Sequence, residues 1–181
     1  MVKVEIKGMD SLRSRINTLS GATKRGIERS LVEIVEETKG EARSELASSV
    51  KHGSGELMGS IDDDLDINGD LFEATVFTDK EQGVYREFGT GRPGFESSKH
   101  LPPNFNPSYR MDPWIFPVSS VSADLTALYN MKRIMWQGEE FYVTSGQKAQ
   151  PFLRPSFLKV QERADEIVAA NVSAELRRAL K

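Results

Sequence analysis

The stretch from Thr23 to Val50, TKRGIERSLVEIVEETKGEARSELASSV, decides the fold more than any other part of the chain. One stripe of it is spaced by threes and fours, which is the repeat of one face of an α-helix. The stripe consists of Ile27, Leu31, Ile34, Val35, Thr38, Ala42, Leu46 and Val50. Glu and Arg fill the other faces, so the pattern predicts an amphipathic helix about 40 Å long. A small domain has little surface with which to cover a helix of this length. Either a neighbouring subunit packs on the helix, or the helix lies across the sheet of its own chain.

The residues before this helix predict two short elements. Residues 2–6 alternate apolar and charged side chains, which is typical of a half-buried strand, and Gly8 ends the run. Asp10 can cap a short helix that continues through Leu19. Ser20-Gly21 is expected to interrupt that helix before the longer one begins.

A hairpin is predicted after the long helix. Ile61–Ile67 and Leu71–Thr78 are strand-like runs joined by Asn68-Gly69, a pair that suits a tight turn because both of its positions need positive φ. Val84–Phe88 is a third short strand candidate, and Gly89-Thr90-Gly91 is expected to form the turn that ends it.

Residues 92–117 contain six of the eight prolines and five of the aromatic residues. Proline is excluded from helix interiors and from central strands, so this segment is predicted to be a long loop. Its aromatic content argues against disorder. Exposed aromatic loops often mark protein contacts, so we expect these side chains to contact a neighbouring subunit. They are Phe95, Phe105, Tyr109, Trp114 and Phe116.

The remaining chain completes an α+β prediction. Ser122–Arg133 is expected to contain a short helix and Glu140–Thr144 a strand, and Pro151–Pro155 leads into a final helix with one apolar face. The sequence therefore predicts a small antiparallel sheet packed against the long helix of the N-terminal half and a C-terminal helix. We expect a single domain over residues 1–181, with a long proline- and aromatic-rich loop inserted at about residues 92–117.

Composition argues against several classes of function. The chain has 181 residues, a net charge of −3, no cysteine and two histidines. No global basic field draws it to nucleic acid, and no apolar run approaches the length of a membrane span. The Ser-x-x-Lys patterns at Ser48–Lys51 and Ser156–Lys159 lack the companion motifs of the enzymes that use them. We therefore expect neither an enzyme nor a bound cofactor.

The segment Asp64–Gly69, DLDING, matches the first six positions of a calcium-binding loop. Such loops need a bidentate Glu at the twelfth position, where this chain has Thr75, and the flanks alternate like strands. The hairpin is the favoured interpretation. A weaker oxygen site stays open, built from Asp62, Asp63, Asp64 and Asp66.

Three segments then occur in a characteristic order: Ser54–Ile61 (SGELMGSI), Val84–Gly91 (VYREFGTG) and Gln147–Phe157 (QKAQPFLRPSF). Together they resemble the tail-component family of tailed bacteriophages, the small neck or tail-completion proteins of siphophages and their prophages. The opening VEIKG is similar too, so the resemblance spans nearly the whole chain. Ser54 stands where Thr is usual, and the region from Arg92 to Trp136 is longer than in short members, so no role is carried onto it.

The resemblance implies a non-catalytic virion protein at the head–tail neck, made in the host bacterial cytoplasm. Subunits would form a ring around the DNA channel, contact other connector and tail proteins, and let DNA pass without sequence-specific binding. A tail terminator or head-closure protein is the nearest alternative, and a metal-dependent binding module is a more distant one.

Two sets of residues follow from this interpretation. The first shapes the fold and consists of Tyr85, Glu87, Phe88, Gly89, Thr90, Gly91, Pro151, Phe152, Leu153, Arg154 and Pro155. The second is expected to face solvent or the DNA lumen, where like charge keeps DNA from sticking, and consists of Asp62, Asp63, Asp64 and Asp66.

Overall fold

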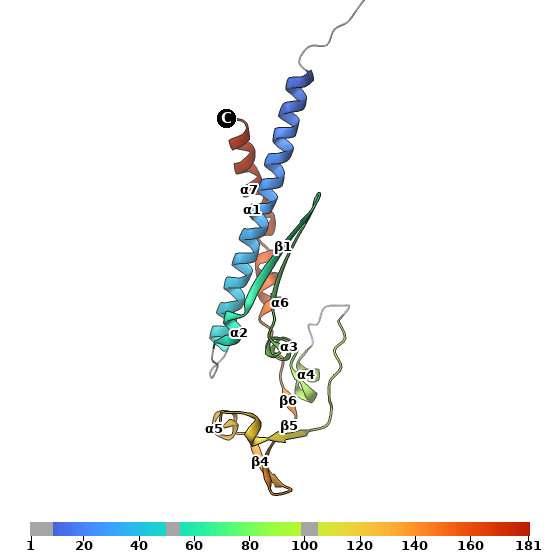
Figure 1. Ribbon diagram of the computed structural model, residues 1–181, viewed down its shortest axis with the longest axis vertical. Helices are drawn as coiled ribbons and strands as arrows, with labels where there is room; N and C mark the ends of the chain where they lie inside the picture. The colour runs from blue at the N-terminus through green and yellow to red at the C-terminus, as the bar shows by residue number, and fades with distance from the viewer. Residues whose placement is uncertain (1–8, 50–54, 99–104) are drawn as a thin grey trace, which may run out of the picture. The chain divides into compact units, whose positions relative to one another are not determined.

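The computed structural model describes residues 9–49, 55–98 and 105–181, and these residues form an α+β fold (Figure 1). The predicted strand over residues 2–6 lies outside the described residues. The helices are α1 (Met9–Ser49), α2 (Glu56–Gly59), α3 (Glu81–Phe88), α4 (Gly91–Ser97), α5 (Leu125–Tyr129), α6 (Leu153–Gln161) and α7 (Ala164–Ala179), with a 3₁₀ turn at Val118–Ser120. The strands are β1 (Ile61–Asn68), β2 (Leu71–Thr78), β3 (Trp114–Pro117), β4 (Lys132–Trp136), β5 (Glu139–Thr144) and β6 (Gly146–Gln147).

The chain divides into two compact units, although the sequence predicts a single domain. The first unit takes its residues from Met1–Glu41, Asp62–Phe77 and Ser156–Lys181, and the second from Ala42–Ile61 and Thr78–Pro155. No described helix is long and apolar enough to cross a membrane.

The first unit contains most of α1, up to Glu41; the whole helix is 41 residues long and therefore about 60 Å in length. The predicted interruption at Ser20-Gly21 is wrong, because the helix continues through both residues. A glycine inside a helix costs only about 1 kcal/mol, which a long helix can absorb. The side chains from Arg13 to Thr18 are all exposed, whereas Ala22, Ser30, Val35 and Thr38 are buried.

Helix α7 packs alongside α1 within this unit (Figure 1). The closest approach is at Gly26, where an added Cβ would lie 2.6 Å from the Cα of Val172. Further ion pairs link α1 to the residues that precede α7. Lys159 of α6 pairs with Glu41, and Arg163, just before α7, pairs with Glu37. The middle of α1 is thus covered by elements of its own chain.

A buried carboxylate forms part of this helix pair. Glu175 of α7 is only 4% exposed, and Arg25, Arg29 and Arg178 all contact it, at distances of 3.3, 3.0 and 2.6 Å. Burial by itself raises the pKa of this carboxyl group. The hydrogen bonds from Arg178 and Arg25 and the charge of Arg29 outweigh that effect, so the pKa of Glu175 lies below its usual range.

The hairpin β1–β2 completes the first unit and confirms the two predicted strands, with a different turn. The turn residues are Gly69 and Asp70 rather than Asn68 and Gly69. Gly69 has φ +67°, and neither Asn68 nor Asp70 has positive φ, which is the pattern of a type II′ turn with glycine first. Lys24 and Lys39 of α1 pair with Asp70 and Asp63 of the hairpin.

The second unit contains a three-stranded antiparallel sheet in the order β3-β5-β4. β5 confirms the strand predicted at Glu140–Thr144, and α5 confirms the short helix predicted within Ser122–Arg133. β4 was not predicted, and the segment predicted as one long loop contains α4 and β3. The predicted strand at Val84–Phe88 is wrong, because these residues belong to α3.

The closeness of α1 and α7 gives a stability test. Gly26→Ala places a methyl group against the Val172 backbone, and overpacking of this kind typically costs about 1–3 kcal/mol. Gly40→Ala is the matched control in the same helix, because nothing lies within 4 Å of its added Cβ. We expect the control to stabilise the helix by about 0.5–1 kcal/mol. Urea denaturation measures both, and an equal effect of the two substitutions would rule out the close helix contact.

The arginine cluster predicts how stability responds to acid. The pKa of Glu175 is lowered by folding, so its contribution to stability is present above the ordinary glutamate pKa of 4.5 and is lost as pH falls through the lowered folded pKa. Glu175→Gln should therefore flatten the loss of stability below pH 4.5. Glu166→Gln on the exposed side of α7 is the control, and thermal melts across acidic pH compare the two variants. Identical pH profiles for wild type and Glu175→Gln would contradict the ion cluster.

Candidate functional site

The structure brings together two of the segments that the sequence singled out, Tyr85–Gly91 and Gln147–Pro155. Both lie within the second unit. The first forms α3 and the start of α4, and the second runs from β6 into α6. Their contacts are made by one buried carboxylate, one backbone crossing and several glycines.

Glu87 of α3 caps the N-terminus of α6. Its carboxylate accepts hydrogen bonds from the backbone N–H groups of Phe152, Leu153 and Arg154, at 2.7, 2.9 and 3.0 Å. The first N–H groups of a helix have no partner inside the helix, and the helix dipole favours negative charge there. Glu87 is only 8% exposed and Phe152 is fully buried, so these charge-assisted bonds are shielded from water. The cap therefore fixes the first turn of α6 to α3 within the second unit.

Helix α3 places Glu87 because of what its inner face contains. The buried residues of this helix are Gly83 and Glu87, four positions apart and hence on the same face. A Cβ at Gly83 would meet the Thr78 side chain at 2.5 Å and the Leu57 side chain at 3.3 Å. Val84 and Tyr85 are exposed on the other faces, at 52% and 42%. The buried face of α3 therefore has Glu87 as its one buried charged side chain, and that side chain forms the cap.

A close backbone crossing follows directly after α3. Thr90 and Gly91 form antiparallel bridges with Gln147 and Gly146. A Cβ at Gly91 would lie 2.0 Å from the carbonyl oxygen of Ser145, and a Cβ at Gly146 would lie 2.0 Å from that of Thr90. Both glycines also have positive φ, +63° and +103°. Only glycine fits either position, so the GTG segment serves this crossing.

Side chains on both segments reinforce the crossing. The Gln147 amide donates to the carbonyl oxygen of Tyr85 at 2.9 Å, and the backbone N–H of Gln150 donates to that of Arg86 at 2.8 Å. The N–H of Ala149 donates to the Ser97 hydroxyl at 2.8 Å. Ser97 was not among the predicted residues, because a serine at a helix end carries no distinctive sequence signal. We call Glu87, its three N–H donors and the two-glycine crossing the capped junction.

The aromatic residues predicted to contact a neighbouring subunit pack against other residues of their own chain, and some of them are also exposed. The rings of Phe105 and Phe88 lie 4.4 Å apart between centroids, and those of Phe95 and Tyr109 lie 6.0 Å apart. The Tyr109 hydroxyl donates to the Phe88 carbonyl oxygen at 3.0 Å. Phe95 is nevertheless 58% exposed.

The two remaining aromatics, Trp114 and Phe116, belong to β3. Phe116 packs on Tyr142, with ring centroids 5.5 Å apart, and Arg110 lies over the Trp114 ring. All five candidate aromatics therefore have partners within their own chain, and their role in subunit contact stays a prediction.

The aspartates of β1 alternate between two faces. Asp62, Asp64 and Asp66 are exposed, and a position facing solvent or the DNA lumen stays a prediction for them. Asp63 instead pairs with Lys39, which is buried and also contacts Glu36 at 3.0 Å. The hydrogen bonds from Asp63 and Glu36 raise the pKa of Lys39. Across the described residues, no three His, Asp or Glu side chains gather in a way that could hold a metal ion.

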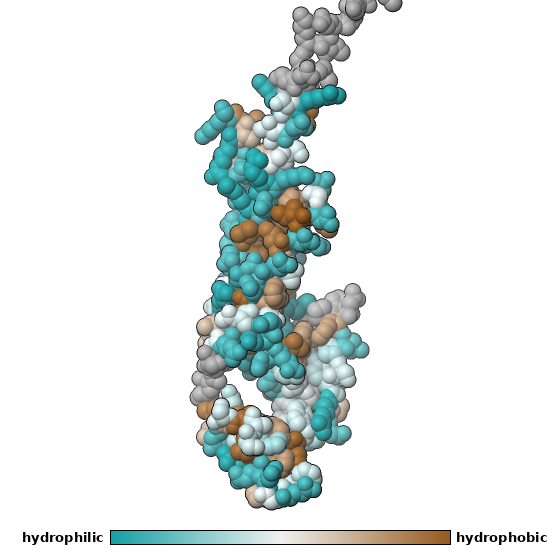
Figure 2. All heavy atoms as spheres, in the orientation of Figure 1, coloured by the Kyte–Doolittle hydropathy of each residue, from teal (hydrophilic) through white to brown (hydrophobic). Residues whose placement is uncertain are grey.

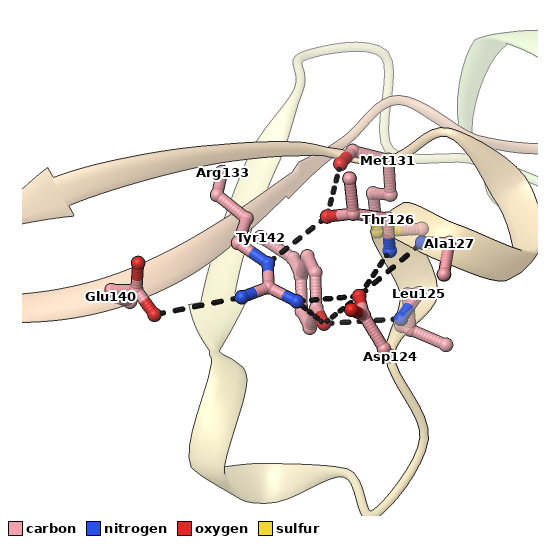
Figure 3. Close-up of polar contacts among 8 residues, drawn as sticks. All are labelled: Asp124, Leu125, Thr126, Ala127, Met131, Arg133, Glu140 and Tyr142. Atoms are coloured by element: carbon pink, nitrogen blue, oxygen red, sulfur yellow. Dashed lines mark hydrogen bonds and ion pairs between the residues drawn. The ribbon is translucent and has the colours of Figure 1, made fainter.

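A second polar cluster joins α5 to the sheet of the second unit (Figure 3). Asp124 caps α5 by accepting from the N–H groups of Thr126 and Ala127, and it also pairs with Arg133 of β4. Arg133 lies over the buried Tyr142 ring and contacts Glu140. The hydrogen bonds from Arg133 and the Ala127 backbone lower the pKa of Asp124. Asp followed by an apolar run is a helix-start signal, so this cap could have been found from the sequence.

Removal of the Glu87 carboxylate tests the capped junction. Glu87→Ala leaves three N–H groups without their acceptor, and buried caps and unsatisfied donors together predict a loss of about 2–4 kcal/mol in unfolding free energy. Glu87→Gln keeps an oxygen acceptor and should lose less. Gln82→Ala, exposed on the same helix, is the control and should change stability by less than about 0.5 kcal/mol. Equal stability of Glu87→Ala and the control would contradict the cap.

No protein-family model, curated protein or solved structure matches this chain. The role of the chain is therefore inferred from its own residues and their contacts.

Proposed function

We propose that this protein is a structural subunit at the head–tail joint of a tailed bacteriophage or prophage, where copies form a ring around the DNA channel. The observation that carries the proposal is the capped junction. Two of the three segments that resemble the tail-component family meet there, so those segments have a joint structural purpose in this chain.

The chemistry of the junction supports a structural rather than a catalytic role. Glu87 is buried, and its carboxylate is fully engaged in holding a helix end. The glycines of the GTG segment are needed for a backbone crossing. Both features of the junction thus have structural explanations. The proposal accordingly includes no enzymatic activity and no cofactor.

The exposed face of β1 supports a position near DNA without sequence-specific binding. Asp62, Asp64 and Asp66 share this face, and like charge repels the phosphate backbone. A lining of this kind would let DNA pass through a ring. The other partners in this proposal are further connector and tail proteins, and the protein would be found in the virion after synthesis in the bacterial cytoplasm. A tail terminator or head-closure protein is the alternative within the same class.

Electron microscopy of particles made without this protein tests the role. We expect heads and tails that fail to join, because a missing ring subunit leaves the joint incomplete. Restoring the wild-type chain should restore joined particles. Normal tailed particles in the absence of the chain would refute the proposal.

The exposed aromatics supply a test of subunit contact. Trp114→Ala should preserve folding, because the Trp114 ring is partly exposed and the side chain that lies over it, Arg110, is exposed. The substitution should nevertheless reduce the yield of joined particles. Leu128→Ala, at a partly exposed apolar position of α5, is the matched control. Circular dichroism checks folding and particle counts measure assembly. Wild-type assembly with Trp114→Ala would remove Trp114 from the contact surface.

A further inference from the structure

The outer edge of β4 carries exposed apolar side chains and pairs with no strand among the described residues. In the part of the chain that the structure describes, β5 is the only strand that pairs with β4. Met135 and Trp136 are 66% and 51% exposed, and hydrophobic side chains gather in this region of the surface (Figure 2). A free edge with exposed apolar side chains is a template for pairing with another strand.

The register of the β4–β5 hairpin decides which backbone groups are free. Gln137 and Gly138 both have positive φ, 52° and 85°, as in a type I′ turn. The residues flanking such a turn, Trp136 and Glu139, form a hydrogen-bonded pair, and paired and unpaired positions alternate from there. The N–H and C=O groups of Arg133 and Met135 therefore point away from β5.

Contacts at the start of β4 agree with this alternation. Met131 has the same parity as Arg133 and Met135, and its backbone groups bond to α5 instead of β5. Its N–H donates to the Leu125 carbonyl oxygen at 3.2 Å, and its own carbonyl oxygen accepts from the Thr126 hydroxyl at 2.9 Å. Helix α5 thus covers the first position of the edge and leaves the next two available.

The opposite edge of the sheet, formed by β3, is a poor hydrogen-bonding partner for β4 of another copy. By the same alternation, Ile115 and Pro117 of β3 point outward, and proline has no N–H to donate. Pro113 precedes the strand, so Ile115 supplies the single outward donor of this edge. A continuous sheet running from β3 of one copy to β4 of the next would therefore lack most of its donors on the β3 side.

The sequence of β4, Lys-Arg-Ile-Met-Trp, instead complements itself about a two-fold axis through Ile134. In that antiparallel arrangement Arg133 lies opposite Met135 of the second copy, so the four outward backbone groups of each strand find partners. Lys132 lies opposite Trp136 of the second copy, where an ammonium group can rest on the indole ring. Arg133 already pairs with Asp124 and Glu140, so its charge does not oppose the contact.

We propose that two copies of the unassembled chain pair through β4, forming one six-stranded sheet across a two-fold axis at Ile134. A two-fold contact uses the same surface on both copies, whereas a ring around a polar channel uses two different surfaces. The pairing therefore belongs to the free protein before assembly. The pairing is a property of the chain in solution, and it does not rest on the proposed virion role.

Single-cysteine variants test the register, because the chain contains no cysteine. Ile134 faces its own copy at a position without hydrogen bonds, where Cα atoms lie about 4.5 Å apart, a separation that a disulfide can bridge. Under mild oxidation, Ile134→Cys should form a covalent dimer at least about tenfold faster than Lys132→Cys or Trp136→Cys. The double variant K132C/W136C should cross-link as readily as Ile134→Cys. Equal rates for all single variants, or no cross-linking at all, would overturn the proposal.

A proline substitution separates pairing from folding. Met135→Pro removes an N–H that points outward and leaves the β5 ladder intact, which an edge strand tolerates. Two-fold symmetry doubles the loss, so the dimer Kd should rise by at least about tenfold. Met135→Thr shortens the same side chain but keeps the N–H and should stay within about threefold. Mass photometry measures the dimer, and circular dichroism confirms folding. Equal Kd values for the two variants would show that the β4 edge does not form the contact, whatever the outcome of the particle experiments.

Discussion

The hydrogen bonds between the Glu87 carboxylate and the first N–H groups of α6 are the contact on which the second unit depends. A helix end leaves its N–H donors without partners, and here a single buried side chain satisfies three of them. A buried carboxylate with fewer hydrogen bonds would be costly, so the Glu87 side chain has to be held rigidly against all three donors. Helix α3 supplies the rigidity, and the glycine crossing brings the two segments together. Each part of the junction thus makes the others possible.

The long helices were predictable because their burial follows the side-chain pattern. The stripe that begins at Ile27 has the periodicity of a helix face, and Val35, Ala42 and Leu46 on it are buried. The predicted final helix is present as α6 and α7, separated by two turn residues, and Val160 and Ile167 lie on its buried side. The two strands of the first hairpin were also found, because their alternation is regular.

The predictions fail where the residues that hold an element in place are glycine, polar or charged rather than apolar. Helix α3 presents Gly83 and Glu87 to the interior, so apolar periodicity cannot reveal it, and its exposed Val84 and Tyr85 imitate a strand. The strand β4 has no alternation, since Arg133 is tied to α5 by polar contacts and its apolar residues are consecutive. The importance of Glu87 was visible only through resemblance, because the contact joins residues about 65 positions apart.

We propose that this chain forms a ring at the head–tail joint and that the capped junction is a rigid part of each subunit. A cryo-electron microscopy reconstruction of the tailed particle tests it most directly. We expect a closed ring of copies around the DNA channel at the neck, with density for the start of α6 continuous with α3 at Glu87. Complete particles that contain no copy of the chain at the neck would refute the proposed role.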